Sequence, residues 1–248
     1  MISLKSPREI ELMRIAGRIV ADTLELLREV IRPGITTMEL DTIAEAYIRK
    51  SGGIPAFKGY NGFPASICSS INEQVVHGIP GSTVLNDGDI IGIDIGAVYD
   101  GYFGDAARSY GIGHIDDKRE KLLRITEESF FKGIEHALVG NRLSDISNAI
   151  QKHVEANGFS VVRDFVGHGI GSSMHEEPQI PNYGLPNRGP RLLAGMALAI
   201  EPMVNQGKYA VKVLKDGWTV VTADGKPSAH YENTIVITNG EPEILTLL

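Results

Sequence analysis

Apolar residues recur at helical spacing in four stretches of the chain. The first stretch begins at Ser6-Pro7-Arg8-Glu9, which has the sequence of a capping box with proline at the first helical position. A second capping box, Thr36–Glu39, begins the next stretch. The pattern predicts helices that end at Pro33-Gly34, Gly52-Gly53, Gly140 and Asn157-Gly158, the third of them spanning 118–139.

The second half of the chain repeats the order of the first. The glycines Gly34 and Gly140, which end corresponding helices, are 106 residues apart, and an apolar strand with a carboxylate follows each helix pair, at Asp94 and at Glu201. We therefore predict an α+β fold of two pseudo-symmetric halves with a shared antiparallel sheet covered by helices on its outer face. Because these strands carry acidic residues, a site is expected between the halves.

The strand Ile90–Gly96 has one carboxylate among four isoleucines. Asp100-Gly101 follows it, a dipeptide typical of a two-residue hairpin turn. A turn there pairs Gly96 with Asp105, so Asp94 and Asp105 become diagonal neighbours on one face, about 7–8 Å apart at Cα. Two buried carboxylates this close repel each other, and a divalent cation would relieve the repulsion. The alternative, an Asp94 exposed to solvent, fits poorly with the isoleucines around it.

The second half offers similar chemistry. Glu201 lies in an apolar strand, Glu232 precedes another, and His168 is flanked by glycines that let a ligand approach the backbone. Acidic oxygens with one or two imidazoles suit a pair of Mn²⁺, Fe²⁺, Co²⁺ or Zn²⁺ ions. Two such ions can share a hydroxide and activate it for hydrolysis. His77 and His175 are further candidates, although a lone histidine is more often structural.

Composition excludes several classes of protein. With 248 residues, 42% of them hydrophobic and 22% charged, the chain is expected to be globular and soluble. A net charge of −7 offers no basic surplus for nucleic acid, and no apolar run is long enough to span a membrane. A single cysteine excludes an internal disulfide. Together with a start that lacks an apolar signal core, this predicts a cytoplasmic protein, and nothing in the pattern indicates more than a monomer.

Six motifs, in order along nearly the whole chain, closely resemble those of the type I methionine aminopeptidases. The family is known for its pita-bread fold of two α+β halves around a dimetal site. Glu201 and Glu232 are only 31 residues apart in sequence, which leaves no room for the helical insertion of type II relatives. No Cys/His-rich extension precedes the first helix, so the short bacterial form is expected. The motifs are Gly92-Ile93-Asp94-Ile95-Gly96, Gly101-Tyr102-Phe103-Gly104-Asp105, Gly167-His168-Gly169-Ile170-Gly171, His175-Glu176-Glu177-Pro178, Ile200-Glu201-Pro202-Met203 and Tyr231-Glu232-Asn233-Thr234.

The resemblance implies one catalytic metallopeptidase domain over 1–248, with the internal repeat at about 1–115 and 116–248. It implies removal of the initiator methionine from nascent proteins when the second residue is small, by a metal-bridged hydroxide that attacks the scissile carbonyl. The cofactors would be two divalent ions per chain, Co, Mn, Fe or Zn. Their ligands, carried over residue by residue, are Asp94, Asp105, His168, Glu201 and Glu232.

The same resemblance assigns the remaining site residues. His77 and His175 would contact the scissile amide and its carbonyl oxygen, and Glu201 would carry a proton to the leaving amine. Residues implied to bind substrate are Tyr60, Phe63, Cys68, His77, Met174, His175 and Trp218. Partners would be the N-termini of nascent polypeptides and of peptides that begin with Met, with transient ribosome association. Two alternatives stay open, a peptidase that cleaves X-Pro bonds and a non-catalytic, peptide-binding member of the same fold.

Overall fold

Four long helices lie where the apolar periodicity predicts them, in a computed structural model that describes residues 2–248. Both predicted capping boxes form: the side chain of Ser6 accepts a hydrogen bond from Glu9 N, and that of Thr36 accepts one from Glu39 N. These bonds satisfy free N–H groups of the first turn and fix where each helix begins. The helices are α1 (Pro7–Val30), α2 (Thr37–Lys50), α3 (Asp117–Ile134) and α4 (Leu143–Ala156).

The third helix is shorter than predicted. It ends at Ile134 instead of residue 139, and the chain continues in a tight turn in which His136 N–H donates to Gly133 O at 3.0 Å. Bonds of this i to i−3 spacing are tighter than those of an α-helix, and they commonly close a helix end. The turn leads to Gly140, whose N–H donates to Leu192 O at 3.0 Å. The spacing of apolar residues in such tight turns is similar to that in a helix, so the sequence pattern could not show that the helix ends at Ile134.

All strand pairs are antiparallel. The first half forms a sheet of β1 (Ile54–Pro55), β4 (Ile90–Tyr99), β2 (Ile67–Ile71) and β5 (Tyr102–Gly111). The second half forms a sheet in the order β15 (Glu243–Ile244), β14 (Asn233–Val236), β9 (Ala197–Ile200), β7 (Gly167–Gly169) and β8 (Glu176–Ile180). Two smaller sheets have the orders β13 (Ser228–His230), β10 (Met203–Asn205), β6 (Ser160–Val161), and β11 (Val211–Val213), β12 (Val220–Thr222), β3 (Gln74–Val76).

Backbone and side-chain bonds join the two large sheets at β5 and the start of β14. Glu232 N donates to Ala107 O at 2.9 Å, and Ala107 N donates to Glu232 O at 3.3 Å. Next to this pair, the Thr234 hydroxyl bonds both the N–H and the carbonyl of Asp105, at 3.0 and 2.9 Å. The sheets of the two halves are therefore joined edge to edge in one continuous surface. The junction lies at Asp105 of the first half and Glu232 of the second.

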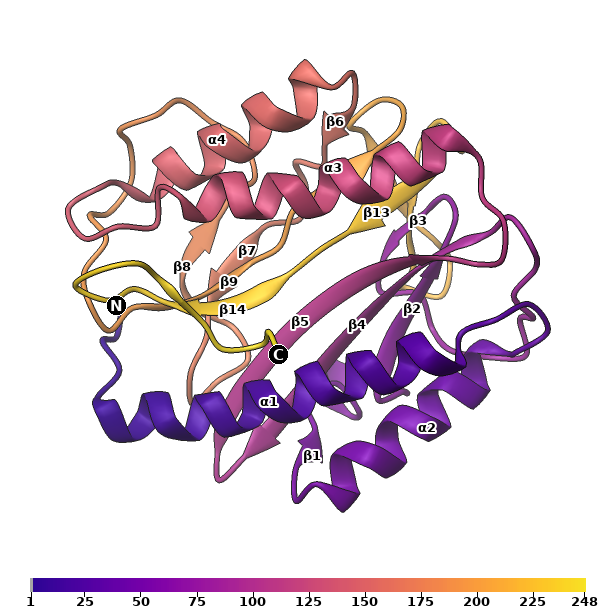
Figure 1. The fold of residues 1–248 in the computed structure, drawn as a ribbon, viewed down its shortest axis with the longest axis horizontal. Coiled ribbons are helices and arrows are strands. Elements are labelled where there is room, and N and C mark those ends of the chain that lie inside the picture. Colours follow the sequence, from indigo (N-terminus) through magenta and orange to yellow (C-terminus); the bar gives the residue numbers. More distant parts are fainter. Residues whose placement is uncertain (1) are drawn as a thin grey trace.

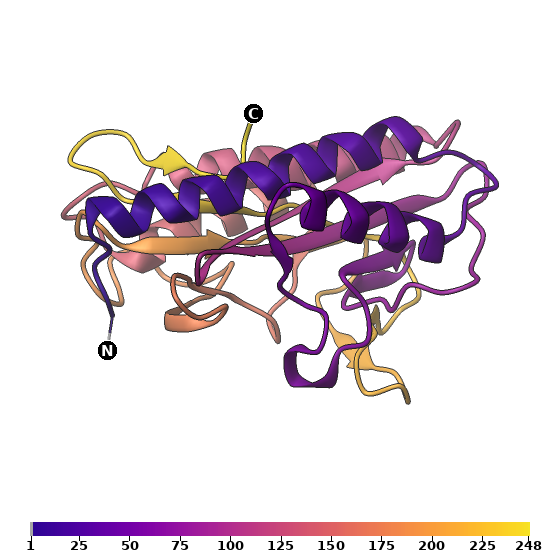
Figure 2. The same cartoon turned by 90° about the horizontal axis from the view of Figure 1, so that it is seen from below.

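The helices cover one face of this surface. In Figure 1, α1 and α2 lie over the first half and α3 and α4 over the second, and in Figure 2 the helices lie on one side while loops gather on the other. Alternation along β4 follows this layering: Ile91, Ile93 and Ile95 are fully buried in the apolar core under α1 and α2. Asp94 therefore points away from the helices, toward the loop side. None of the helices in residues 2–248 combines the length and apolar character needed to cross a membrane.

Candidate metal centre and active site

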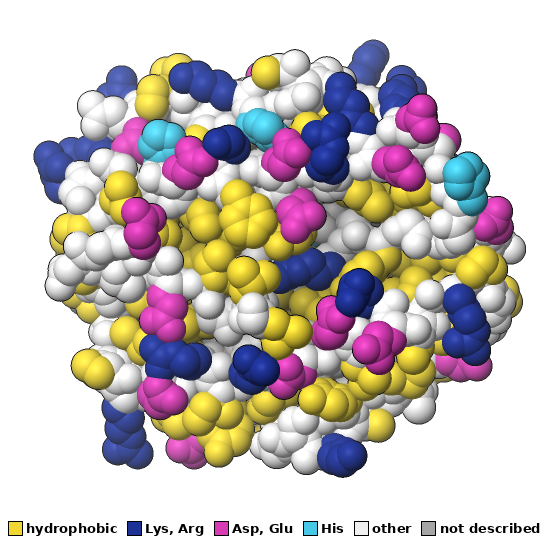
Figure 3. Space-filling model, viewed as in Figure 1, with side chains coloured by type: hydrophobic (Ala, Val, Ile, Leu, Met, Phe, Trp, Pro, Cys, Tyr) yellow, Lys and Arg dark blue, Asp and Glu magenta, His cyan; other side chains and the backbone are white. Residues whose placement is uncertain are grey.

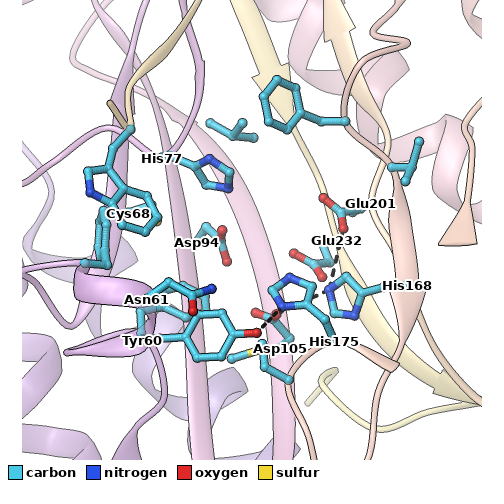
Figure 4. Close-up of a pocket in the computed structure, with 17 residues that line it drawn as sticks. Tyr60, Asn61, Cys68, His77, Asp94, Asp105, His168, His175, Glu201 and Glu232 are labelled. Atoms are coloured by element: carbon cyan, nitrogen blue, oxygen red, sulfur yellow. Dashed lines mark hydrogen bonds and ion pairs between the residues drawn. The ribbon is translucent and has the colours of Figure 1, made fainter. Parts of the chain in front are cut away.

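The predicted hairpin forms with the expected register. Tyr99 is opposite Tyr102, Gly96 is opposite Asp105, and Asp94 is opposite Ala107. Because side chains alternate along a strand, Asp94 and Asp105 project from the same face of the hairpin, as Figure 4 shows. The hairpin prediction is confirmed, since a two-residue turn determines the register of both strands.

Three more site residues come from neighbouring strands of the second half. His168 lies in β7 opposite Ala199 of β9, Glu201 directly follows β9, and Glu232 directly precedes β14. His168 Nε2 is 3.7 Å from Glu201 Oε1 and 4.0 Å from Asp105 Oδ2. The structure thus brings together all five residues that the sequence analysis named as metal ligands, in one cavity (Figure 4).

The acidic residues of this cluster lack the partners that buried carboxylates need. Asp94 Oδ1, Asp105 Oδ1 and Glu232 Oε1 are buried and form no hydrogen bond with any residue of 2–248. Burial raises the pKa of Asp94 to about 7, and burial together with neighbouring carboxylates raises the pKa values of Asp105, Glu201 and Glu232 well above their usual range. A cation between these oxygens would remove both the desolvation cost and the repulsion.

The donor atoms have the chemistry and spacing of a divalent metal site. Ligand atoms of Asp105, His168 and Glu232 lie within 4.8 Å of one another, and so do those of Asp94, His230 and Glu232. Mixed carboxylate and imidazole donors suit Mn²⁺, Fe²⁺, Co²⁺ and Zn²⁺. The residues present therefore fit a metal centre.

The orientation of His168 supports metal binding. Its Nδ1 lies 2.9 Å from Gly169 O, and a carbonyl only accepts, so Nδ1 carries the hydrogen. Burial lowers the pKa of His168 to about 4, so the ring is neutral near pH 7 and Nε2 keeps its lone pair. That lone pair faces Asp105 and Glu201. A backbone carbonyl that orients a histidine in this way is common around metal ligands.

His77 and His175 line the same cavity. His175 Nδ1 and the Tyr60 hydroxyl share a hydrogen bond of 2.7 Å, which holds the ring 4.3 Å from that of His168 between centroids. His77 packs edge-on against Phe165, and its backbone adopts a positive φ of 61°. Burial lowers the pKa values of both rings, that of His77 to about 4. Two neutral imidazoles therefore border the acidic cluster.

Apolar side chains form the other wall of a cavity of about 270 Å³. Phe63 and Trp218 pack edge to face with ring centroids 5.1 Å apart, and Cys68 lies against them. Burial raises the pKa of the Cys68 thiol well above its usual range, which argues against a nucleophile and agrees with a role in the wall. Met174 is also buried against this space. Every residue predicted to bind substrate lines the cavity: Tyr60, Phe63, Cys68, His77, Met174, His175 and Trp218.

Gly96 makes room for this wall. A Cβ at this position would lie 2.7 Å from Phe57 Cε1 and 2.9 Å from Met174 Cε, which is closer than real Cβ contacts. Gly96, two residues from Asp94 on β4 and opposite Asp105 on β5, therefore leaves the space in which Met174 reaches the cavity. Phe57, Asn61 and Phe165 also line it, and of these Phe165 was not predicted.

His230 was missed by the sequence analysis. It is 3% exposed, and its Nε2 lies 3.7 Å from Glu201 Oε2 and 3.8 Å from Glu232 Oε2. Burial lowers its pKa to about 3, so the ring is neutral. A signal was present, because His230 and Glu232 are two residues apart in an extended segment and so project to the same side.

The segment before α1 braces the loop that carries His175. Lys5 is 8% exposed, its N–H donates to Gly195 O at 2.7 Å, and its ammonium pairs with Glu176 Oε2 at 2.5 Å. Glu176 Oε1 also accepts from Ser173 N at 3.2 Å. A partly buried ion pair therefore ties the loop that carries His175 to the N-terminal segment.

Comparisons with known proteins identify the family of this chain. Residues 11–239 match metallopeptidase family M24. The chain is 66% identical to the methionine aminopeptidase of Clostridium perfringens over 248 residues, all of both chains. It also superposes on the crystal structure of methionine aminopeptidase from Thermotoga maritima with a TM-score of 0.99, at 49% identity and over 100% of both chains. The chain belongs to metallopeptidase family M24 and, within it, to the methionine aminopeptidases.

The prolidase from Pyrococcus furiosus bears on the X-Pro alternative. Its structure has a TM-score of 0.79 with this chain, but the identity is 23% and the match covers 65% of the prolidase. That likeness shows the fold alone, which is the predicted pita-bread α+β fold. The comparisons therefore do not favour an X-Pro peptidase.

Proposed function

We propose that this chain is a metal-dependent aminopeptidase that removes N-terminal methionine from polypeptides whose second residue is small. One observation carries the proposal: five carboxylate and imidazole side chains converge at one end of an apolar cavity that two neutral histidines border. The identity of the chain to the methionine aminopeptidase of Clostridium perfringens supports the same activity.

The metal ligands in this proposal are Asp94, Asp105, His168, Glu201 and Glu232. Two divalent ions, from among Co, Mn, Fe and Zn, match the number and type of these donors. When bound, such ions polarise a carbonyl and lower the pKa of water, so that a nucleophile is available near neutral pH. The unpaired oxygens of Asp94, Asp105 and Glu232 support this assignment, since each is buried without a hydrogen bond from within residues 2–248.

The chain's own residues then orient the substrate and move the proton. His175, held by Tyr60, is suited to donate to the scissile carbonyl oxygen as negative charge develops there. His77 is suited to contact the scissile amide, and Glu201 to carry a proton to the leaving amine. Both histidines are neutral near pH 7, which leaves each ring one donor and one acceptor.

The apolar wall suits a methionine side chain. Met174 and Cys68 offer polarisable sulfur, and Phe63 and Trp218 offer flat apolar surface. His77 and His175 narrow the space beside the acidic cluster, so a bulky second residue is excluded. In this proposal residues 1–248 form one catalytic domain that acts as a cytoplasmic monomer on nascent N-termini, with transient ribosome association.

Peptide cleavage tests the proposal. Met-Ala-Ser, Met-Lys-Ser and Ala-Pro-Ser peptides are incubated with protein reloaded with Co²⁺ or Mn²⁺, and with chelator-treated protein. Release of methionine from Met-Ala-Ser alone, lost with chelator, is the expected result. Cleavage of the Ala-Pro peptide would favour the X-Pro alternative, and absence of cleavage in metal-loaded protein would favour a binding role.

A further inference from the structure

His230 lies at the edge of the acidic cluster, with a ring nitrogen within 4.8 Å of carboxylate oxygens of Asp94 and Glu232. It is absent from the described residues that line the substrate cavity. It lines instead a groove on the helix side, between Arg28 of α1 and Glu127 of α3. Figure 3 shows the face that carries this groove. His230 therefore borders both this groove and the candidate metal ligands.

The backbone of His230 is held from two sides. Ser109 Oγ on β5 accepts from His230 N and donates to His230 O, both at 2.9 Å. On the other side, His230 pairs with Met203 in the β13–β10 ladder. A residue bonded on both sides has little freedom to shift, so the position of its imidazole is determined by the fold.

The Nε2 atom of the imidazole is buried and lies near two carboxylates. Within residues 2–248, no group hydrogen-bonds its Nε2, and the two nearest carboxylate oxygens belong to Glu201 at 3.7 Å and Glu232 at 3.8 Å. Both distances are longer than the donor–acceptor distance of a hydrogen bond. A small rotation of either carboxylate would bring one of its oxygens within hydrogen-bonding distance of Nε2. An unpaired buried polar atom lowers the stability of the fold. The unpaired Nε2 of His230, held beside two candidate ligands, therefore needs an explanation.

We propose that His230 is a positioning residue for the metal centre, whose single Nε2–H is shared between the carboxylates of Glu201 and Glu232. The inference rests on the proposed metal centre. Each glutamate would then present its remaining lone pairs to the cation, in an orientation that the imidazole holds. Groups that orient metal ligands in this way typically change metal affinity by about 10–100-fold when they are removed.

The test compares side chains that keep or lose the donor. Metal-free wild-type protein, His230→Gln and His230→Leu are titrated with Co²⁺ by isothermal titration calorimetry, and the visible absorption of bound Co²⁺ is recorded. His230→Leu should bind Co²⁺ about 10–100-fold more weakly, whereas His230→Gln, which keeps an N–H of similar reach, should lose less than about tenfold. His153→Gln is the control, because His153 pairs with Glu128 on the surface at 3.0 Å and should leave binding unchanged.

The outcomes separate this inference from the proposed function. Wild-type protein that binds no Co²⁺ would overturn the metal centre and the inference with it. If wild type binds but His230→Leu binds equally well, only the role of His230 fails. Equal large losses in His230→Gln and His230→Leu would identify His230 as a direct ligand and overturn the positioning role.

Folding is controlled separately. The metal-free form of each variant is melted, and His230→Leu should be no less stable than wild type, because it removes an unpaired buried atom. If the leucine variant does not fold, His230→Asn replaces it, since this amide is too short to reach the glutamates. The expected result is weak binding by the asparagine variant and near wild-type binding by His230→Gln, and equal binding by the two would refute the proposal.

Discussion

Replacing Asp94 with asparagine should make the stability of the metal-free protein less sensitive to pH. Asp94 is half-buried in β4 with its Oδ1 shielded from solvent, and desolvation raises its pKa from 3.8 to about 7 in the folded chain. The unfolded chain keeps the ordinary pKa, so the folded state holds a proton that the unfolded state has lost. Protonated Asp94 therefore makes its full contribution to the free energy of unfolding below about pH 4. This contribution falls as the pH rises, and it is lost once the pH has passed about 7.

The size of the effect follows from one proton. Between the two pKa values, each pH unit lowers the free energy of unfolding by about 1.4 kcal/mol for each proton held only by the folded state. Over the interval from 3.8 to about 7 the loss sums to about 4 kcal/mol. An asparagine has no proton to lose, so the slope in Asp94→Asn should be smaller by about 1.4 kcal/mol per pH unit.

Urea unfolding measures this difference. Wild type, Asp94→Asn and the control Asp100→Asn are unfolded in the presence of a chelator at several pH values between the two pKa values of Asp94. Asp100 is exposed in the turn of the same hairpin at a φ of 46°, a conformation that asparagine adopts readily. The control should therefore keep the slope of wild type.

Parallel slopes for wild type and Asp94→Asn would refute the reasoning, since they would mean that Asp94 is ionised in the folded metal-free chain. A second measurement adds saturating Co²⁺. Because ligands must lose their protons to bind a cation, the stabilisation by Co²⁺ should grow with rising pH in wild type and should be weaker in Asp94→Asn.

Three further predictions concern the site. Asp105→Asn should lose activity and most bound metal together, because an amide cannot replace the charge of a carboxylate, and retention of two metals with normal turnover would contradict its role. His168→Ala should lose activity through metal loss and recover partly in excess metal, whereas His175→Ala should keep its metal and lower kcat by about 10²–10³-fold. Metal content and steady-state kinetics, measured across a metal titration, distinguish the two variants. The reverse pattern would exchange the roles of the two histidines. Lys5→Met should lower the free energy of unfolding by about 1–3 kcal/mol, measured by urea unfolding, because it leaves Glu176 as an unpaired, partly buried charge. Adding Glu176→Gln should restore part of the loss, and no restoration would indicate that the ion pair does not hold this loop.

Local rules explain what the sequence alone could predict. A two-residue turn at Asp100-Gly101 sets the register of a hairpin, and strict alternation then places Asp94 and Asp105 on one face. Capping boxes likewise determine where α1 and α2 begin, because their partners are three residues apart. The motifs in register along the chain indicated the family before any contact between distant residues was known.

Contacts between distant segments needed the tertiary structure. The five candidate ligands meet only because β5 bonds to the start of β14 through Ala107 and Glu232, more than a hundred residues apart. Such a junction depends on how two halves pack, through many weak contacts that no local pattern encodes. The same reason applies to the early end of α3 and to the pairing of Lys5 with Glu176. His230 is the clearest case: alternation places it on the same side as Glu232, but only the packing of β13 against β5 and β10 aims its Nε2 at two glutamates.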